Sequence, residues 1–365
     1  MRRRAFLHTG IQAGLAAAVP SIRAAVIGHA EGDHLGHYFR TALCQGVEAF
    51  AVSDPSGKIF EAARKAAGGR EIATFADPVR MLREFRPHLA VISLEPRSMP
   101  EAIIEAVRGG AHVVVEKPAC TRLDQFEAAA RAGKAAGRQV MLAMATRLHP
   151  AVGQIRELAS RGYFGRGYGA DMHWVADQTR LRNPAYHQSW KSSRERGGGG
   201  KLIFHGVHYL DLIQHLTGAA ISEVAGFCRN VGGQPIEVED AAVISMVFSD
   251  GMVGTLNTGY YLDRGYSNLI VLWGSEGWFR FDPRSAAPLA WSSVAPSAPK
   301  GEQRVENGAA PNLYDLMLQA AVDYCRGLRG PFMTTDESVA VLRVVFAAYR
   351  AAETGISQKV RLGAV

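Results

Sequence analysis

The first half of the chain alternates short apolar segments with segments of helical periodicity, which limits the folds open to it. The apolar segments have the length and composition of buried strands. They are Ala24–Gly28, Phe50–Ser53, Ile72–Phe75, Leu89–Leu94, Val113–Val115 and Val140–Ala145. Between the first two, Leu35, Phe39, Ala42 and Leu43 recur at helical spacing. Strands alternating with helices build a parallel sheet, so residues 22–147 are predicted to form a doubly wound α/β domain.

The carboxyl ends of the predicted strands should share one edge of this sheet, where open α/β folds bind ligands. Gly28, Asp54, Pro96, Lys117 and Arg147 each follow a predicted strand. We therefore expect these residues to lie along a common ligand-binding edge.

The tripeptide Glu116-Lys117-Pro118 ends the fifth predicted strand. The proline forces Lys117 into an extended backbone and stops the strand, so a lysine is fixed at the mouth of the sheet. A solvated lysine after a strand is the ordinary alternative for such a tripeptide taken alone.

A glycine-containing turn follows the first predicted strand. It carries Gly28, His29, Gly32 and Gly36, although not as a strict G-x-G-x-x-G. A tight turn that opens a helix can hold a pyrophosphate against free backbone N–H groups. A glycine-rich connection without a ligand remains the alternative. Asp54 at the end of the second strand supports a dinucleotide, because its carboxylate suits a ribose and repels a 2′-phosphate. NAD is therefore favoured, while Lys58 keeps NADP open.

Residues 148–365 are predicted to form a second domain with a largely antiparallel sheet. The expected strands are Tyr168–Val175, Ser222–Asn230, Ala241–Phe248, Met252–Tyr261, Asn268–Trp273 and Trp278–Phe281. Short turns at 249–251 and 274–277 indicate two hairpins. Helices are expected at 149–160, 312–326 and 336–353, the last two packing on the first domain or bridging the two domains. Residues 285–311, rich in Pro, Ala and Ser, are predicted to be irregular.

A second chemical motif begins with the four glycines at 197–200, which leave the backbone open to close approach by a ligand. In the helix that follows, His208, Asp211 and His215 would share a face. His205, His208 and Asp211 could be considered as metal ligands, but their spacing argues against it, and no metal site is predicted.

The composition excludes several classes of protein. The formal charge is +7, yet the basic residues are scattered without a basic-aromatic stripe, so nucleic acid is not an expected partner. Cys44, Cys120, Cys228 and Cys325 lie too far apart for a C-x-x-C motif, so neither a disulfide framework nor a zinc site is expected.

The N-terminal residues 1–18 resemble a twin-arginine export signal. Arg3-Arg4-Ala5-Phe6-Leu7 fits R-R-x-F-L, and Ala16-Ala17-Ala18 offers a small-residue cleavage site. The intervening apolar stretch is too short for a stable membrane span. Export to the periplasm is the prediction, with a retained amphipathic helix in a cytoplasmic protein as the alternative.

The order of motifs resembles that of the Gfo/Idh/MocA family, which includes glucose–fructose oxidoreductase and inositol dehydrogenase. The motifs are A-V-I-G, S-D-P, E-K-P, T-R-x-x-P and G-G-G-x-L-x-x-x-G-x-H-x-x-D, and they cover nearly all of the chain after Ile22. The resemblance implies a Rossmann domain followed by an α+β domain with an open sheet, often assembled into dimers or tetramers through that sheet. It also implies a bound NAD or NADP and a sugar, cyclitol or related polyol as substrate.

By position, Lys117 matches the family's active-site lysine, and His208 matches the histidine of the second motif. The family often has an aspartate four positions before that histidine, where this chain has Phe204. His205 stands beside it, and on an ordinary helix it would point elsewhere. Because Phe204 cannot carry a proton, the sequence does not identify which groups would relay it.

The resulting hypothesis is an NAD(P)-dependent oxidoreductase. His208 would act as acid and base because histidine titrates near neutral pH, and Lys117 would polarise the reacting oxygen. Asp211, Arg147 and His205 are the expected substrate contacts. The expected cofactor contacts are Gly28, His29, Gly32, Asp54, Pro96, Glu116 and Lys117. The alternatives are a glycoside hydrolase or lyase that retains NAD and oxidises the sugar transiently, and a catalytically silent nucleotide-binding regulatory protein.

Overall fold

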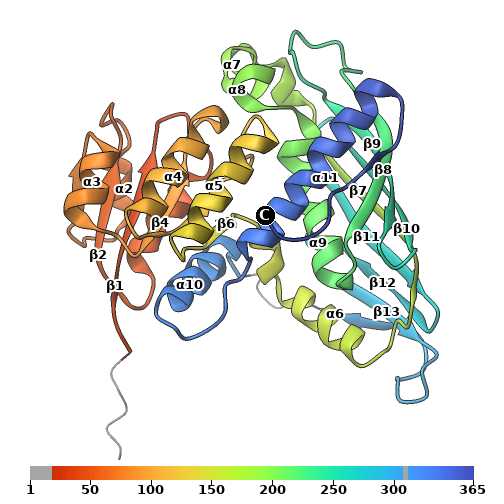
Figure 1. Ribbon diagram of the computed structural model, residues 1–365. Helices are drawn as coiled ribbons and strands as arrows, with labels where there is room; N and C mark the ends of the chain where they lie inside the picture. The colour runs from red at the N-terminus through yellow and green to blue at the C-terminus, as the bar shows by residue number, and fades with distance from the viewer. Residues whose placement is uncertain (1–18, 307–310) are drawn as a thin grey trace, which may run out of the picture.

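The computed structural model describes residues 19–306 and 311–365, which form two domains side by side (Figure 1). A six-stranded parallel sheet makes the first domain, and a nine-stranded sheet makes the second. The expected fold class, a doubly wound parallel sheet followed by a large, mostly antiparallel open sheet, is confirmed.

The first sheet has the strand order β3-β2-β1-β4-β5-β6, and all of its pairs are parallel. The strands are β1 Ile22–Gly28, β2 Val47–Ser53, β3 Ala73–Phe75, β4 Leu89–Ser93, β5 His112–Val115 and β6 Val140–Leu142. The central strands β4 and β5 are almost wholly buried because helices cover both faces of the sheet. All six predicted strands are therefore present.

The connections between these strands are helical. They are α1 Leu35–Tyr38, η1 Phe39–Leu43, α2 Phe60–Ala66, α3 Pro78–Phe85, η2 Pro96–Ser98, α4 Met99–Arg108 and α5 Leu123–Ala135. The first helix is shorter than its apolar spacing suggests. It makes one α-helical turn and continues as a 3₁₀ helix, where the Thr41 hydroxyl donates a hydrogen bond to the Tyr38 carbonyl.

The second sheet has the strand order β14-β13-β12-β11-β7-β10-β9-β8-β15. Its bounds are β7 Gly167–Asp177, β8 Ile221–Arg229, β9 Ala241–Phe248, β10 Val253–Leu262, β11 Tyr266–Gly274, β12 Gly277–Phe281, β13 Leu289–Ser293, β14 Gln303–Val305 and β15 Gln358–Lys359. Both predicted hairpins form, β9 with β10 and β11 with β12. Among the described strand pairs of this second sheet, β7 with β10 is parallel and all others are antiparallel.

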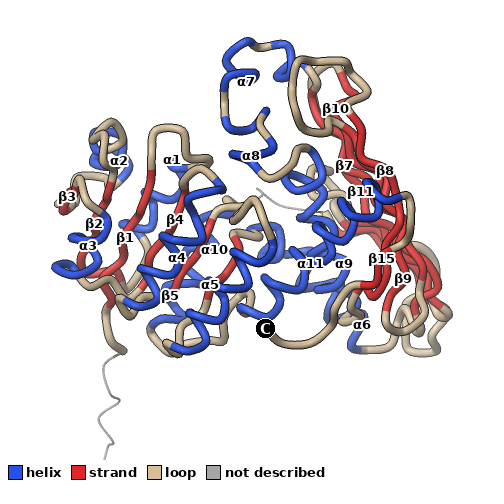
Figure 2. The backbone as a smooth tube through the Cα atoms, turned by 45° about the horizontal axis from the view of Figure 1, so that its top comes forward, coloured by secondary structure: helices blue, strands red, loops and turns tan. Residues whose placement is uncertain are grey.

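Most of the remaining helices lie on one face of this sheet, the face turned toward the first domain, whereas the helix at 313–325 lies against the first domain (Figure 2). The remaining helices are η3 Ala145–Leu148, α6 Pro150–Ser160, η4 Thr179–Arg182, α7 Pro184–Gln188, η5 Trp190–Ser192, α8 Arg194–Gly197, η6 Leu202–Gly206, α9 Val207–Thr217, α10 Leu313–Cys325 and α11 Thr335–Thr354. The opposite face carries alternating exposed residues, as in β9.

The prediction of an irregular segment at 285–311 is wrong. The segment contains β13 and β14, and residues 307–310 lie outside the described part of the chain. In β13, Leu289 and Trp291 point into the core, and Trp291 pairs with Phe279 of β12. The alternation needed for a strand was present, but a composition rich in Pro, Ala and Ser concealed it.

The two C-terminal helices return to the first domain. Arg40 of η1 makes a two-point ion pair with Asp315 of α10 at 2.7 Å. Strand β6 lies at the edge of the parallel sheet, and the hydroxyls of Thr335 and Ser338 in α11 accept hydrogen bonds from the Val140 and Leu142 amides. Side chains of α11 thereby satisfy an edge that would otherwise expose unpaired amides.

The export-signal prediction concerns residues 1–18, which lie outside the described residues. Within the described ranges 19–306 and 311–365, no helix is long and apolar enough to cross a bilayer.

Candidate active site

A cavity of about 360 Å³ lies between the two domains, at the carboxyl ends of β1 and β5. The first domain lines it with Asp33, His34 and Lys117. The second domain lines it with Arg180, Tyr186, Lys191, Phe204, His205 and Tyr260. A groove of 670 Å³ between α5 and α11 is larger, but it contains none of the residues that the sequence singled out. The chemistry of the side chains therefore identifies the 360 Å³ cavity as the candidate site.

Lys117 occupies the position expected from the sequence. It follows β5, its side chain is largely buried, and its Nζ lies 3.6 Å from Oε1 of Glu116. The Glu116 carboxylate also accepts hydrogen bonds from His34 Nδ1, at 2.8 Å, and from the Tyr38 hydroxyl. Glu116 thus ties the lysine to α1, the helix that follows the glycine-containing turn.

Glu116 remains charged although it is almost completely buried. Burial alone would raise the pKa of its carboxyl. The Lys117 ammonium and the hydrogen bonds from His34 and Tyr38 outweigh burial and lower the pKa to about 2. A permanent anion behind Lys117 holds the ammonium at the cavity wall.

The glycine-rich motif leads into a π-helical turn, η6, and not directly into an α-helix. Such turns are rare and are found mostly at functional sites. The extra residue in the turn changes the direction of His205. Its ring packs at a tilt on Trp174 and edge-on against Tyr260, and it lines the cavity beside Phe204. The expectation that His205 points elsewhere assumed α-helical geometry, which is absent here.

His208 follows in α9 and packs on Trp174, with ring centroids 5.1 Å apart. Its Nδ1 is buried without a hydrogen-bond partner among the described residues. Burial, followed by the charge on Lys117, lowers the pKa of His208 to about 3. His208 is therefore a neutral ring in the electrostatic field of Lys117, although it does not line the cavity.

The four glycines at 197–200 do not face open space. A Cβ atom on Gly199 would lie 2.1 Å from the Tyr349 hydroxyl, and one on Gly200 would lie 1.9 Å from the Glu239 carbonyl. The close approach that the sequence suggested is made by the protein itself and not by a ligand. These glycines instead let η6 and α9 pack closely on α11 and the segment before β9.

The turn after β1 has the features that a pyrophosphate needs. Gly32 must be glycine, because a Cβ there would lie 2.4 Å from the Ser93 carbonyl, and its amide donates to the His29 carbonyl at 2.7 Å. Gly36, in the first turn of α1, has open space where a Cβ would sit. First-turn amides lack intrahelical partners. His29 is exposed, and Gly28 is buried at the end of β1.

The other predicted cofactor residues also lie at strand ends. The Asp54 carboxylate accepts hydrogen bonds from the Ser56 amide and hydroxyl and from the Ile59 amide. Burial would raise its pKa, but the bonds from Ser56 and Ile59 leave the pKa lowered, so Asp54 keeps its charge. Pro96 is buried at the start of η2, just after β4.

Second-domain residues hold the turn after β1 in place. Lys191 binds Asp33 at 2.6 Å, and Arg196 binds Glu31 at 3.2 Å. The indole of Trp190 donates to the Glu31 carbonyl at 2.9 Å. These contacts neutralise two carboxylates that would otherwise repel a pyrophosphate. The residues present therefore fit a dinucleotide.

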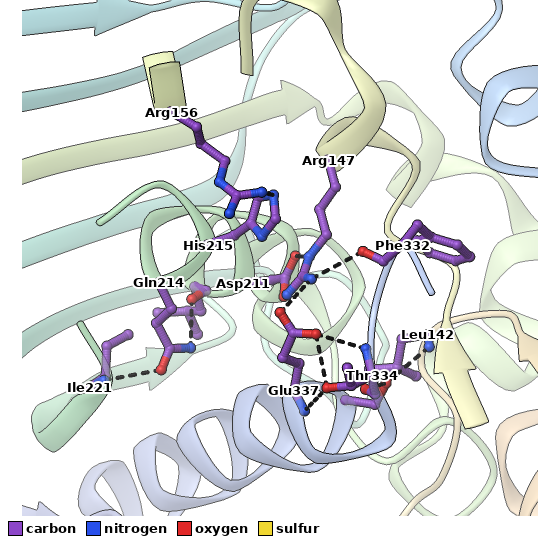
Figure 3. Close-up of polar contacts among 12 residues, drawn as sticks. Leu142, Arg147, Arg156, Asp211, Gln214, His215, Ile221, Phe332, Thr334 and Glu337 are labelled. Atoms are coloured by element: carbon purple, nitrogen blue, oxygen red, sulfur yellow. Dashed lines mark hydrogen bonds and ion pairs between the residues drawn. The ribbon is translucent and has the colours of Figure 1, made fainter. Parts of the chain in front are cut away.

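Arg147 and Asp211 lie elsewhere, in a second cavity of about 300 Å³ (Figure 3). Arg147 donates two hydrogen bonds to Asp211 and one to Glu337. His215 lies at the rim of this cavity and contacts Arg156 at 3.3 Å. The structure thus brings Lys117 and His205 together and leaves Arg147 and Asp211 apart from them.

Four further site residues carried no recognisable sequence signal. Arg180, Tyr186 and Tyr260 line the cavity, and Lys201 lies fully buried behind Tyr260, with its Nζ 4.4 Å from the ring centre. A lysine within a glycine-rich motif was visible in the sequence, but its burial was not. Among the described residues, no group of three or more His, Cys, Asp and Glu side chains is arranged to hold a metal ion.

Two protein-family models match the chain. A model described as an oxidoreductase family with an NAD-binding Rossmann fold matches residues 22–144. A model described as the GFO/IDH/MocA C-terminal domain matches residues 152–280. Together the two matches span most of the chain, and they divide it between the two sheets.

Known proteins of similar sequence are distant. The 1,5-anhydro-D-fructose reductase of Ensifer adhaerens is 23% identical over 276 residues, which are 72% of this chain and 77% of that protein. The 2,7-anhydro-N-acetylneuraminate hydratase of Escherichia coli strain K12 is 25% identical over 193 residues, 51% of this chain. The match spans only 49% of the hydratase.

Solved structures share the fold over nearly the whole chain. The WlbA dehydrogenase from Bordetella pertussis, in complex with NADH and UDP-GlcNAcA, has a TM-score of 0.78 at 21% identity and covers 94% of this chain and 99% of its own. Levoglucosan dehydrogenase, in complex with NADH and L-sorbose, has a TM-score of 0.82 at 18% identity, with coverages of 93% and 99%.

Proposed function

The chain belongs to the Gfo/Idh/MocA family of oxidoreductases, and from that premise we propose that it transfers a hydride between a nicotinamide cofactor and a sugar, cyclitol or related polyol. One observation carries the proposal. The 360 Å³ cavity joins Lys117, at the carboxyl end of a Rossmann strand, to His205, in a π-helical turn of the second domain. This is the position at which folds of this type bind their ligands.

Oxidation of an alcohol requires the hydroxyl proton to leave as the hydride departs. The bound nicotinamide supplies the hydride acceptor or donor. Lys117 binds the reacting oxygen and stabilises the negative charge that develops on it. Glu116, fixed at 3.6 Å, keeps the ammonium in place during this step.

His208 is the proposed acid and base. Its pKa of about 3 keeps the ring neutral at pH 7 but also makes it a weak base, so the proposed role requires substrate binding to raise that pKa toward the working pH. His205 lines the cavity directly, which makes it a substrate contact and the competing candidate for proton transfer. Phe204, in the position of the family's aspartate, packs on Trp190 and offers no acidic group.

We propose NAD over NADP as the cofactor. Asp54 keeps its negative charge at the end of β2, where it would favour ribose hydroxyls and repel a 2′-phosphate. Lys58 is exposed nearby, and among the described residues it forms no ion pair. Nothing therefore holds its ammonium in place to bind a 2′-phosphate. The two comparison structures bind NADH.

A second candidate function follows from the contacts that Trp190, Lys191 and Arg196 make with the turn after β1. These contacts enclose the turn, and an enclosed nucleotide would stay bound between turnovers. The enzyme would then be a hydrolase or lyase that oxidises its sugar transiently and reduces it again. Replacement of the family's aspartate by Phe204 is compatible with such chemistry.

The test begins with purified full-length protein, whose bound nucleotide is identified by mass spectrometry. Nicotinamide absorbance is then followed with a panel of sugars and polyols. A net change with one of them supports the dehydrogenase, and release of an aglycone without a net change supports the second candidate. Lys117→Ala and His208→Ala should each lose most turnover while still binding nucleotide. Turnover near wild type would remove these roles, and failure to bind any dinucleotide would overturn the proposal.

We also propose export by the twin-arginine route, on the sequence Arg3-Arg4-Ala5-Phe6-Leu7. Replacing both arginines with lysine should retain the protein in the cytoplasm, as measured by cell fractionation. Unchanged distribution of the double variant would favour the cytoplasmic alternative.

A further inference from the structure

The candidate cavity carries more positive than negative charge. Lys117, Arg180 and Lys191 contribute three cations, and Asp33 is the lining residue with a carboxylate. Lys191 binds Asp33 at 2.6 Å, and Lys117 lies 3.6 Å from buried Glu116. Two of the three cations therefore have a carboxylate partner in the protein.

Arg180 has none. Among the described residues no carboxylate lies within ion-pair distance of its guanidinium. Its partners there are phenol side chains: Nη2 donates to the Tyr266 hydroxyl at 2.9 Å, and the guanidinium lies beside the Tyr260 ring. The guanidinium carbon lies 5.5 Å from the centre of the Tyr260 ring. These neutral groups orient the guanidinium, and Asp177 acts on it only beyond ion-pair distance, so within the described residues Arg180 has no direct carboxylate partner.

Lys201 adds a buried amine to the same wall. Its side chain is fully buried, and its Nζ has no hydrogen-bond partner within the described residues. The Nζ lies 4.4 Å from the centre of the Tyr260 ring, so Arg180 and Lys201 are both neighbours of one cavity-lining tyrosine. Buried amines are normally hydrogen-bonded, and an unpartnered one calls for a physical reason.

The positive charges near the cavity also affect the pKa values of Lys201 and His205. Burial, and then the charges on Arg180 and Lys117, lower the pKa of Lys201 to about 6. Burial, and then Lys201 and Lys117, lower the pKa of His205 well below its ordinary value. Burial and the neighbouring cations thus both oppose protonation of Lys201 and His205, and an anion in the cavity would counteract the effect of the cations.

We infer that the substrate is a sugar acid and that Arg180 binds its carboxylate. The inference rests on the proposed function, which places the sugar in this cavity. A volume of 360 Å³ is near the lower end of ligand pockets, as suits a monosaccharide. One guanidinium N–H is used by Tyr266, and the remaining donors can bind the two oxygens of a carboxylate side by side. The small volume of the cavity favours a carboxylate over the larger phosphate group.

The test uses the full-length protein saturated with NADH and compares matched ligands by isothermal titration. D-glucuronate and D-galacturonate are set against D-glucose and D-galactose, which carry a hydroxymethyl group where the uronates carry the carboxylate. D-glucose 6-phosphate is the phosphate arm. At least one uronate should bind on the order of tenfold or more tighter than its neutral partner and tighter than the phosphate.

The Arg180→Gln variant should lose this preference, and Arg180→Lys should keep part of it. Arg182→Gln is the matched control, because it removes the same charge two residues away at an exposed position that does not line the cavity. Unchanged NADH affinity and unchanged thermal unfolding without sugar show that each variant remains folded.

Equal binding of uronate and neutral sugar overturns the inference, as does a uronate preference that survives in Arg180→Gln. Failure of both uronates to bind, or tighter binding of the phosphate, also overturns it. Loss of NADH binding or of hydride transfer instead counts against the proposed function. A uronate preference without hydride transfer leaves the inference standing, so the two failures are distinguishable.

Discussion

Arg147 and Asp211 form a two-point ion pair inside the molecule, with Nε–Oδ2 and Nη2–Oδ1 distances of 2.8 and 2.7 Å. Their side chains are only 4% and 3% exposed. The pair joins the segment after β6 to α9, the helix that carries His208. Helix α9 is thus joined by an ion pair to the end of the first domain, at a point outside the candidate cavity (Figure 3).

Removing one member of this pair should therefore be costly. In Asp211→Ala, Arg147 would keep the Phe332 carbonyl and, among the described residues, a single carboxylate partner, Glu337, which is 40% exposed, and the free energy of unfolding should fall by about 3–5 kcal/mol. Urea denaturation at neutral pH measures the loss. The control is Glu84→Ala, which breaks the exposed Arg80–Glu84 pair and should change stability by less than about 1 kcal/mol. Similar effects of the two substitutions would contradict the assignment.

Glu116 should make stability depend on acid pH. Its folded pKa of about 2 lies below the ordinary value near 4.5, so its carboxylate stabilises the fold above about pH 4.5. This contribution, on the order of 3 kcal/mol, disappears as the pH falls from about 4.5 to 2. Glu116→Gln should thus destabilise the protein at neutral pH and much less near pH 3, as measured by urea unfolding. A deficit that is the same at both pH values would refute this.

Lys201 should act in the opposite sense. Because its folded pKa is about 6, the unfolded chain holds a proton that the folded chain lacks between about pH 6 and 10. The resulting penalty grows as the pH falls through this range, at about 1.4 kcal/mol per unit.

Lys201→Met removes that penalty. The variant should unfold at a higher urea concentration than wild type at pH 6 to 7, and the gain should shrink toward about pH 10. Lys300→Met, at an exposed position, is the control and should show no such trend. Destabilisation by Lys201→Met at neutral pH would show that the amine has a partner in solution.

The outward face of the nine-stranded sheet should form the contact between copies of the chain. Val247 pairs with Val253, Val253 with Gly169, and Gly169 with Trp273, so one row across four strands carries three apolar side chains, with a glycine in β7. Val253 and Trp273 are 55% and 48% exposed. An exposed apolar row of this kind marks an interaction surface, and the family's assembly through its open sheet makes a second copy the expected occupant.

A charge in this row should therefore separate the copies. Val253→Asp combined with Trp273→Ser should yield monomers in light scattering, whereas Val294→Asp, just beyond β13, should not. Wild-type protein that is already monomeric would remove the prediction.

The first domain was predictable because its strands are apolar runs buried on both faces, and each run could be read without knowing its neighbours. Strand β13 was missed because its position is fixed by pairing between Trp291 and Phe279, a contact that sequence composition does not show. Lys117 could be placed because Pro118 limits the backbone locally.

The second-domain half of the site was harder to predict. The direction of the His205 side chain depends on a π-helical turn. If the same sequence is assumed to form an α-helix, His205 is expected to point away from the cavity. Arg147 follows a strand as expected, but its guanidinium binds the buried carboxylate of Asp211, which lies 64 residues later in the chain. The role proposed for Arg180 depends on which side chains surround its guanidinium in the fold. The sequence near Arg180 does not show that no described carboxylate lies within ion-pair distance.

The hydrogen bonds from Val140 and Leu142 to the hydroxyls of Thr335 and Ser338 have a consequence for synthesis. The parallel sheet is translated within the first 142 residues, but the groups that finish its last strand emerge nearly 200 residues later. During that interval the nascent chain presents an unsatisfied strand edge to other polypeptides. A ribosome that stops before α11 would thus release a product prone to aggregate, although every residue of its nucleotide-binding sheet had been made.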